Sequence, residues 1–201
     1  MKKIKFNEKV TKELTKGAII RTGFPGFKED YLGIHSLIKI SKIHHFMEIG
    51  TSSGEGTKVI ANAIGLQKWK FWENYGKKLY SIDVPPGTNP KIIYPGAEDG
   101  HPKKAGAACD YPYIQLFGDS TKFDFSLYYP IEGWFIDGKH NYVYAKKDTL
   151  QALKSNPSLI IWHDKQIEGV KEAILDVMTK KHNYDLFDLI GTRLIYAVKK
   201  Q

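Results

Sequence analysis

Apolar residues along this chain fall into short continuous runs and longer helical repeats. The short runs predict buried strands at residues 45–49, 78–84, 113–117, 133–136 and 158–163. Stretches with apolar residues every three or four positions predict helices at 29–43, 54–64, 142–154 and 167–181. Two last strands, 184–190 and 193–198, are separated by Gly191-Thr192, a connection short enough for a hairpin.

This order of elements predicts an α/β fold with a doubly wound, Rossmann-like sheet. The expected sheet has seven strands, mostly parallel, and an antiparallel strand in the C-terminal hairpin. Ligands of such sheets bind where the parallel strands end. Polar residues that directly follow each strand are therefore the candidate functional residues.

Chain length and composition favour one domain over the whole chain, 1–201. With 201 residues and 42% hydrophobic content, the chain can bury one substantial core. Residues 1–43 are expected to form an N-terminal helical or lid segment. Residues 85–112 are rich in Gly, Pro and charge and have little periodicity, which predicts a long active-site loop.

The net charge is +8, but the lysines are scattered in pairs along the chain. This scatter disfavours a dedicated nucleic-acid surface. The single cysteine, Cys109, excludes an intrachain disulfide, and no apolar run approaches the length of a membrane span. We therefore expect a cytoplasmic protein without a membrane partner; the oligomeric state stays open, with a homo-oligomer among the alternatives.

The most informative segment is the turn that follows the first predicted strand, after Glu48. The turn reads Gly50-Thr51-Ser52-Ser53-Gly54. Glycines let a ligand lie against the backbone, and the next helix presents unpaired N–H groups. An acid just before the turn would repel a pyrophosphate, so Glu48 favours a cationic ligand over a dinucleotide. The alternative is an ordinary strand-to-helix turn in which Ser52 and Glu55 form a capping box.

Two other strands end in acids suited to a nucleoside. Asp83 lies at the end of the second strand, where a carboxylate can accept both hydroxyls of a ribose; the alternative is a surface aspartate in a turn. Asp119 and Ser120 follow the third strand, and a helix N-cap explains this pair equally simply.

The fourth and fifth strands end in polar residues that need partners. The fourth runs into Asp137-Gly138-Lys139-His140, and the fifth into His163-Asp164. Both acids should lie at the same edge of the sheet. Polar groups at the end of an apolar strand are costly unless they are bonded, and a metal ion would be one such partner.

These motifs resemble those of a known enzyme class. The spacing E-x-G-x-x-x-G is similar to the first motif of the class I S-adenosylmethionine (SAM) methyltransferases, with Ser52 where many members have a glycine. The run Ile136-Asp137-Gly138-x-His140-x-Tyr142, followed by a helix and then His163-Asp164, resembles the small macrocin and antibiotic-sugar O-methyltransferases. The resemblance extends from about residue 46 to residue 165.

The resemblance implies roles for the candidate residues. Glu48 would face the methionine amino group of SAM, and Asp119 would border the adenine. Asp137 and Asp164, with His163, would bind a divalent metal, magnesium or manganese. The chain departs from its relatives at Lys139 and His163, where some members have acids; an imidazole also suits softer metals such as iron or zinc.

The predicted function is SAM-dependent methyl transfer to a hydroxyl of a small or sugar-like acceptor. Asp137, Lys139 and His140 are the candidate catalytic residues, with His140 accepting the hydroxyl proton; its alternative role is an N-cap contact for the helix that follows. Two other functions stay open, an RNA ribose 2′-O-methyltransferase and a non-catalytic protein that binds SAM or a nucleotide. An NAD-dependent oxidoreductase is disfavoured by Glu48 and by the absence of G-x-G-x-x-G.

Overall fold

The computed structural model describes residues 1–5, 27–68, 71–85 and 105–200. Residues 6–26 of the expected lid segment and 86–104 of the expected active-site loop lie outside these ranges. Both expectations therefore stay predictions over those residues.

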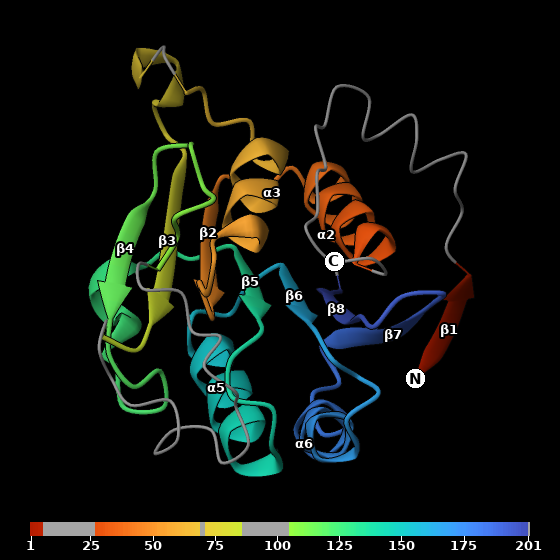
Figure 1. Ribbon diagram of the computed structural model, residues 1–201. Helices are drawn as coiled ribbons and strands as arrows, with labels where there is room; N and C mark the ends of the chain where they lie inside the picture. The colour runs from red at the N-terminus through yellow and green to blue at the C-terminus, as the bar shows by residue number, and fades with distance from the viewer. Residues whose placement is uncertain (6–26, 69–70, 86–104, 201) are drawn as a thin grey trace.

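The described residues form one eight-stranded sheet at the centre of the molecule (Figure 1). Its order is β1-β7-β8-β6-β5-β2-β3-β4, and β8 runs opposite to its neighbours β6 and β7. The strands are β1 (Lys2–Lys5), β2 (His45–Ile49), β3 (Lys78–Asp83), β4 (Ile114–Phe117), β5 (Gly133–Ile136), β6 (Leu159–Trp162), β7 (Tyr184–Ile190) and β8 (Ile195–Lys199). The doubly wound, mostly parallel sheet with an antiparallel hairpin strand is confirmed.

The eighth strand, β1, was not predicted from the sequence. It reads Lys-Lys-Ile-Lys, with one apolar residue, so it carries no pattern of alternation. It pairs in parallel with the edge strand β7, an arrangement that a local pattern cannot indicate. The N-terminal segment thus contributes a strand as well as the expected helix.

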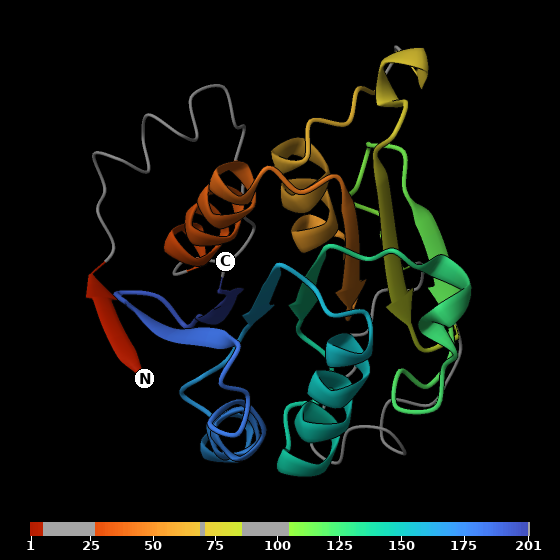
Figure 2. The ribbon, with the colours of Figure 1, turned by 180° about the vertical axis from the view of Figure 1, so that it is seen from behind.

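Helices cover both faces of the sheet (Figures 1 and 2). One face carries α2 (Lys28–Ser41) and α3 (Glu55–Ala63), and the other carries α5 (Tyr142–Lys154) and α6 (Glu168–Met178). Two short 3-10 helices, η1 (Phe71–Asn74) and η2 (Phe125–Tyr128), lie in connections. None of the described helices has the length and apolar character needed to cross a membrane.

Each face has its own apolar core. Ile34, Ile38 and Ile60 of α2 and α3 pack on one side, and a second cluster with α5 and α6 contains the fully buried Trp134 and Trp162. Both indoles donate hydrogen bonds, Trp134 Nε1 to Ser155 Oγ (2.9 Å) and Trp162 Nε1 to Thr149 Oγ1 (2.9 Å). With β5 and β6 buried on both faces, their continuous apolar runs are explained.

The hairpin turn is longer than the sequence indicated. We expected the last strand to begin at Arg193, but β8 begins at Ile195. The backbone N–H of Arg193 donates to Asp30 Oδ1 on α2 (2.7 Å) instead of pairing within the hairpin. A contact with a residue 163 positions away therefore sets the start of the strand.

Candidate functional site

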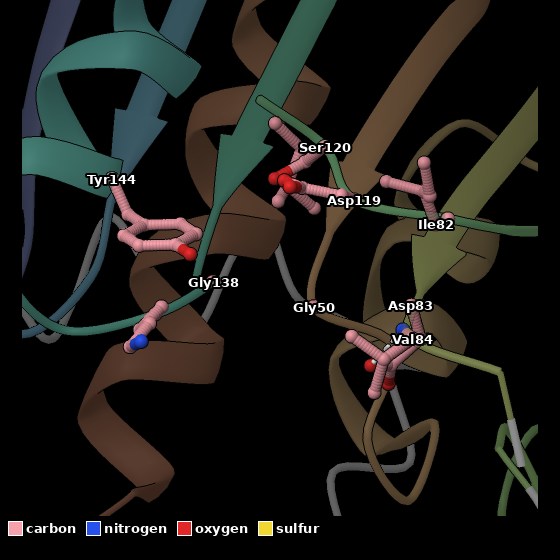
Figure 3. Close-up of a pocket in the computed structure, with 11 residues that line it drawn as sticks. Gly50, Ile82, Asp83, Val84, Asp119, Ser120, Gly138 and Tyr144 are labelled. Carbon is pink, nitrogen blue, oxygen red and sulfur yellow. Dashed lines mark hydrogen bonds between the residues drawn. The ribbon is translucent and has the colours of Figure 1, made fainter. Parts of the chain in front are cut away.

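The central strands end in register, which brings their following residues together. Ile49 of β2 is paired with Ile82 of β3 and with Ile136 of β5, and Ile136 is paired with Trp162 of β6. A pocket opens at this edge (Figure 3). Its lining consists of Ile49, Gly50, Ile82, Asp83, Val84, Gly118, Asp119, Ser120, Gly138, Lys139 and Tyr144.

The glycine turn between β2 and α3 requires its glycines. Gly50 has φ 98° and Gly54 has φ 91°, in the left-handed region. A Cβ on Gly50 would lie 2.1 Å from the Asp137 carbonyl oxygen. Gly54 is the N-cap of α3, and no side chain caps the helix, so the capping-box alternative for Ser52 and Glu55 is wrong.

The described end of the loop after β3 packs on this turn, a contact that the sequence did not predict. Gly106 N donates to Ser52 O (2.9 Å), and Ala108 N donates to Ser53 O (2.7 Å). A Cβ on Gly54 would lie 2.6 Å from Gly106 Cα. Two glycines that face each other allow this close approach of the two backbones.

Glu48 lies inside the protein beneath the turn and does not line the pocket. It is 1% exposed, and its Oε2 accepts hydrogen bonds from Thr57 Oγ1 (2.5 Å) and Ser81 Oγ (2.6 Å). Thr51 Oγ1 contacts the same Ser81 hydroxyl (2.6 Å). Burial raises the pKa of Glu48 to about 8, despite the two hydroxyl donors.

Asp83 joins the pocket to the glycine turn. Its carboxylate accepts from Ser52 N (2.7 Å) and from Val84 N (2.7 Å), and it lines the pocket. Asp83 is buried, so the surface-turn alternative is wrong. The structure therefore places this acid where it can meet a ligand.

Asp119 and Ser120 border the same pocket from the end of β4. Asp119 Oδ1 accepts from Thr121 N (3.0 Å) and Thr121 Oγ1 (2.7 Å), and Ser120 Oγ donates to the buried Asp148 (2.7 Å). The N-cap alternative is wrong, because the next described helix is η2, capped by Asp124.

Lys139 lines the pocket. Tyr144 of α5 borders it as well (Figure 3). The Nζ of Lys139 is 4.5 Å from the centre of the Tyr144 ring, a cation–π contact. The structure thus puts this candidate catalytic residue in the lining of the pocket. Tyr144 was not singled out from the sequence.

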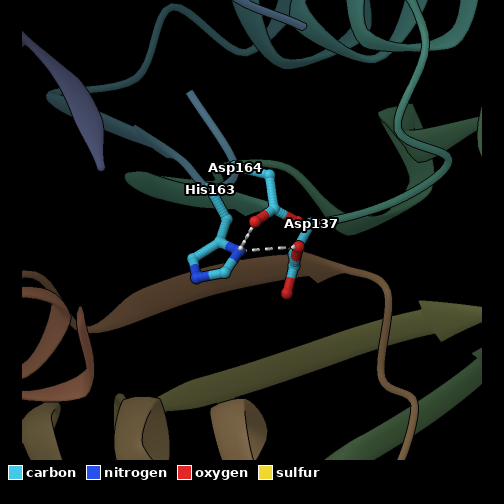
Figure 4. A group of neighbouring side chains, drawn as sticks. All are labelled: Asp137, His163 and Asp164. Carbon is cyan, nitrogen blue, oxygen red and sulfur yellow. Dashed lines mark ion pairs between the residues drawn. The ribbon is translucent and has the colours of Figure 1, made fainter. Parts of the chain in front are cut away.

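Beside the pocket, Asp137, His163 and Asp164 form a compact group (Figure 4). One potential ligand atom from each residue lies within 4.8 Å of the others. His163 Nδ1 is 3.3 Å from Asp137 Oδ1 and 3.2 Å from Asp164 Oδ1. Asp164 has φ 56°, an uncommon conformation for a residue with a side chain, and such positions often occur at functional sites.

This group has the properties of a cation site. His163 Nδ1 is buried and forms no well-aligned hydrogen bond, although two carboxylates flank it. Burial alone would lower the pKa of His163, but the charge of Asp137 and hydrogen bonds to nearby carboxylates raise it to about 12. Burial would raise the pKa of Asp137, yet the imidazoles of His163 and His140 hold it below its usual value. The carboxylates thus stay ionised and attract positive charge.

His140 lies at the open side of this group. Its Nε2 is 3.2 Å from Asp137 Oδ1 and 3.1 Å from Asp164 Oδ2, and its side chain is 43% exposed. The hydrogen bond to Asp137 raises the pKa of His140 against the effect of burial. The N-cap alternative is wrong, because Asn141 caps α5 by accepting from Tyr144 N (3.1 Å).

Two residues near the group of Asp137, His163 and Asp164 were not singled out from the sequence, Asp30 on α2 and Arg193 in the hairpin turn. Asp30 Oδ2 lies 3.3 Å from His163 Nε2, and Arg193 Nη1 lies 3.6 Å from Asp164 Oδ1. Neither follows a parallel strand of the predicted sheet. Their separation in the chain from residues 137–164 left no local signal.

No protein-family model matches this chain, and a search of curated proteins finds no match. Solved structures do match. CalS11, a TDP-rhamnose 3′-O-methyltransferase of calicheamicin biosynthesis, is 17% identical with a TM-score of 0.56; the match covers 95% of this chain and 93% of that one. The O-methyltransferase TomG from Streptomyces achromogenes, in complex with SAM, is 14% identical with a TM-score of 0.57, over 98% and 92% of the two chains.

A third match is MycE, a methyltransferase of the mycinamycin biosynthetic pathway, in complex with Mg and S-adenosylhomocysteine. It is 13% identical with a TM-score of 0.52, over 95% of this chain and 55% of that one. The chain therefore has the Rossmann-like fold of O-methyltransferases, as the sequence resemblance implied. At these identities the likeness establishes the fold.

Proposed function

We propose that this protein is a SAM-dependent methyltransferase that methylates a hydroxyl of a small or sugar-like acceptor with the help of a divalent cation, magnesium or manganese. The observation that carries the proposal is the adjacency of two sites at one sheet edge. Gly50 and Gly138 line the nucleoside pocket, and Asp137, which precedes Gly138, belongs to the metal group. A methyl donor and an ionised acceptor need such adjacent sites.

SAM would occupy the pocket and the glycine turn. The backbone from Gly50 to Gly54 would lie along the methionine part, with Thr51, Ser52 and Ser53 between the glycines. Asp83 would accept the ribose hydroxyls, because a carboxylate has lone pairs beyond the two that it uses for Ser52 N and Val84 N. Asp119 and Ser120 would border the adenine. Glu48, buried beneath the turn, would support it through Ser81, which also contacts Thr51.

The residues of the metal group fit a divalent cation. Two carboxylates and an imidazole nitrogen without a well-aligned hydrogen bond converge there. Asp137, His163 and Asp164 would hold the ion. A bound cation would position the acceptor hydroxyl and lower its pKa. MycE, which shares this fold over 55% of its chain, was crystallised with Mg, and this supports the proposal.

His140 is suited to take the acceptor's proton at Nδ1. Its Nε2 lies within hydrogen-bonding distance of Asp137 and Asp164, and a carboxylate only accepts. The neutral ring therefore keeps its proton on Nε2 and presents its lone pair on Nδ1. A raised pKa makes that nitrogen a better base.

The proposal is tested by binding and by product analysis. Calorimetry with SAM and with NAD should give heat of binding for SAM alone. Incubation with methyl-labelled SAM and a panel of acceptors, including TDP-rhamnose, simple phenols and a structured RNA, should give a labelled small-molecule product whose formation falls on chelation. Labelled RNA would favour the ribose methyltransferase alternative, and SAM binding without product from any acceptor would favour the non-catalytic one.

A further inference from the structure

Asp30, near the start of α2, is a buried acid with two basic neighbours. It is 1% exposed. Its Oδ1 accepts from Arg193 N (2.7 Å), and its Oδ2 accepts from Arg193 Nε (2.7 Å) and lies 3.3 Å from His163 Nε2. Burial of a carboxylate is costly, and these partners together lower the pKa of Asp30 against the effect of burial.

The imidazole of His163 is held on its faces as well. Phe27 stacks on the ring, with centroids 5.9 Å apart, and Phe135 meets it edge-on at 6.2 Å. The Arg193 guanidinium lies over the Phe27 ring, 3.7 Å from its centre. Nε2 of His163 lies beside Asp30, so Nδ1 is the ring nitrogen that faces Asp137 and Asp164.

We propose that Asp30 is a positioning residue for the metal centre: by accepting the Nε2–H of His163, it fixes the tautomer and ring orientation that make Nδ1 the metal-binding atom. Metal-binding histidines commonly donate their other ring N–H to a carboxylate, which also raises the basicity of the ligand. The inference rests on the proposed metal site. It extends that site to α2, an element outside the strand ends.

Arg193 orients this carboxylate. Its backbone N–H and its guanidinium bind both oxygens of Asp30, so the lone pairs that face His163 are fixed. The guanidinium also lies 3.6 Å from Asp164 Oδ1.

The test is the affinity of the purified full chain for Mn²⁺, measured by electron paramagnetic resonance of the free ion without SAM or acceptor. Asp30→Asn should weaken Mn²⁺ binding about 10- to 100-fold. In a His163→Ala background, the same substitution should change affinity less than about 3-fold, because there is no ring to hold. Equal losses in both backgrounds would overturn the inference.

Asp188→Asn is the matched control. Asp188 is also a buried acid paired with a cation, Lys165, and it lies on β7. This variant should bind Mn²⁺ like the wild type. If Asp188→Asn loses as much Mn²⁺ affinity as Asp30→Asn, then removing any buried acid weakens binding, and the inference fails.

Folding of each variant is checked by circular dichroism. If Asp30→Asn does not fold, Asp30→Glu keeps the charge for Arg193 but displaces the carboxylate from Nε2, and should still weaken Mn²⁺ binding; wild-type affinity in that variant would overturn the inference. Wild-type protein that binds no Mn²⁺ would overturn both this inference and the metal part of the proposed function. Wild-type binding with an unchanged Asp30→Asn variant would overturn the inference alone.

Discussion

The acids at the two halves of the sheet edge have different kinds of partner. On the side proposed to bind the nucleoside, Glu48 is bonded by two hydroxyls and Asp83 by two backbone N–H groups. On the metal side, Asp137 and Asp164 are surrounded by the imidazoles of His140 and His163, and the Arg193 guanidinium lies near Asp164.

This difference has opposite electrostatic consequences. Neutral donors do not offset the burial of Glu48, whose pKa is raised to about 8. Cationic neighbours more than offset the burial of Asp137, whose pKa is lowered. One half of the edge thus suits the recognition of a ligand by shape and hydrogen bonds, and the other concentrates negative charge for a cation.

The largest expected effect comes from removing charge on the metal side. Asp137→Ala should reduce methyl transfer by at least about 1000-fold, since both the metal and His140 lose a partner. SAM affinity should stay within about 3-fold of wild type, because the nucleoside half is intact. Mass spectrometry of the product measures methyl transfer, and calorimetry measures SAM affinity. The control is Asp176→Ala. Asp176, on α6, forms exposed ion pairs with Lys146 and Lys180, so this variant should keep full activity.

Gly50 joins the two halves, so its substitution should damage both. Gly50→Ala places a methyl group against the Asp137 carbonyl at a left-handed φ, and should cost about 3 kcal/mol or more of unfolding free energy. Gly76→Ala is the matched control, because Gly76 has φ 75° and open space around it; about 1 kcal/mol is expected. Urea denaturation measures both. Equal losses of unfolding free energy in the two variants would mean that the left-handed backbone conformation alone explains the effect.

Asp83→Asn should affect the nucleoside half alone. Loss of the charge weakens acceptance from ribose hydroxyls, so SAM affinity should fall about 10- to 100-fold, with Mn²⁺ affinity unchanged. Asp124→Asn is the control, since Asp124 makes a similar turn contact with Ser126 and does not line the pocket. A parallel loss of Mn²⁺ binding would show that the halves are not separable.

Glu48 should produce a pH effect on stability. Its pKa rises from 4.5 to about 8 on folding, so the folded state keeps a proton that the unfolded state releases between these values. Stability should therefore fall as pH rises through this window, by at most about 5 kcal/mol. Glu48→Gln removes this contribution, so its urea midpoint should depend less on pH between 5 and 9 than that of the wild type. Identical slopes would contradict the raised pKa.

Local pattern was sufficient to predict most of the elements and the residues at the strand ends. Continuous apolar runs correctly indicated β5 and β6, because strands covered on both faces need no polar positions. Register then brings residues that follow parallel strands to one edge, so Asp83, Asp119, Asp137 and Asp164 could be named together. The strand β1 escaped prediction, since four residues with three lysines carry no such pattern.

Partners across long separations could not be read from the chain. The sequence indicated that Glu48 is an acid at a strand end, and folding buried it between Thr57 and Ser81. It also indicated His163 as a candidate ligand, but gave no sign that Asp30, 133 residues away, lies 3.3 Å from its Nε2 while Nδ1 faces Asp137 and Asp164. Periodicity depends on neighbours within a few residues, whereas tautomers, pKa values and ligand geometry depend on whichever groups the packed helices and strands bring into contact.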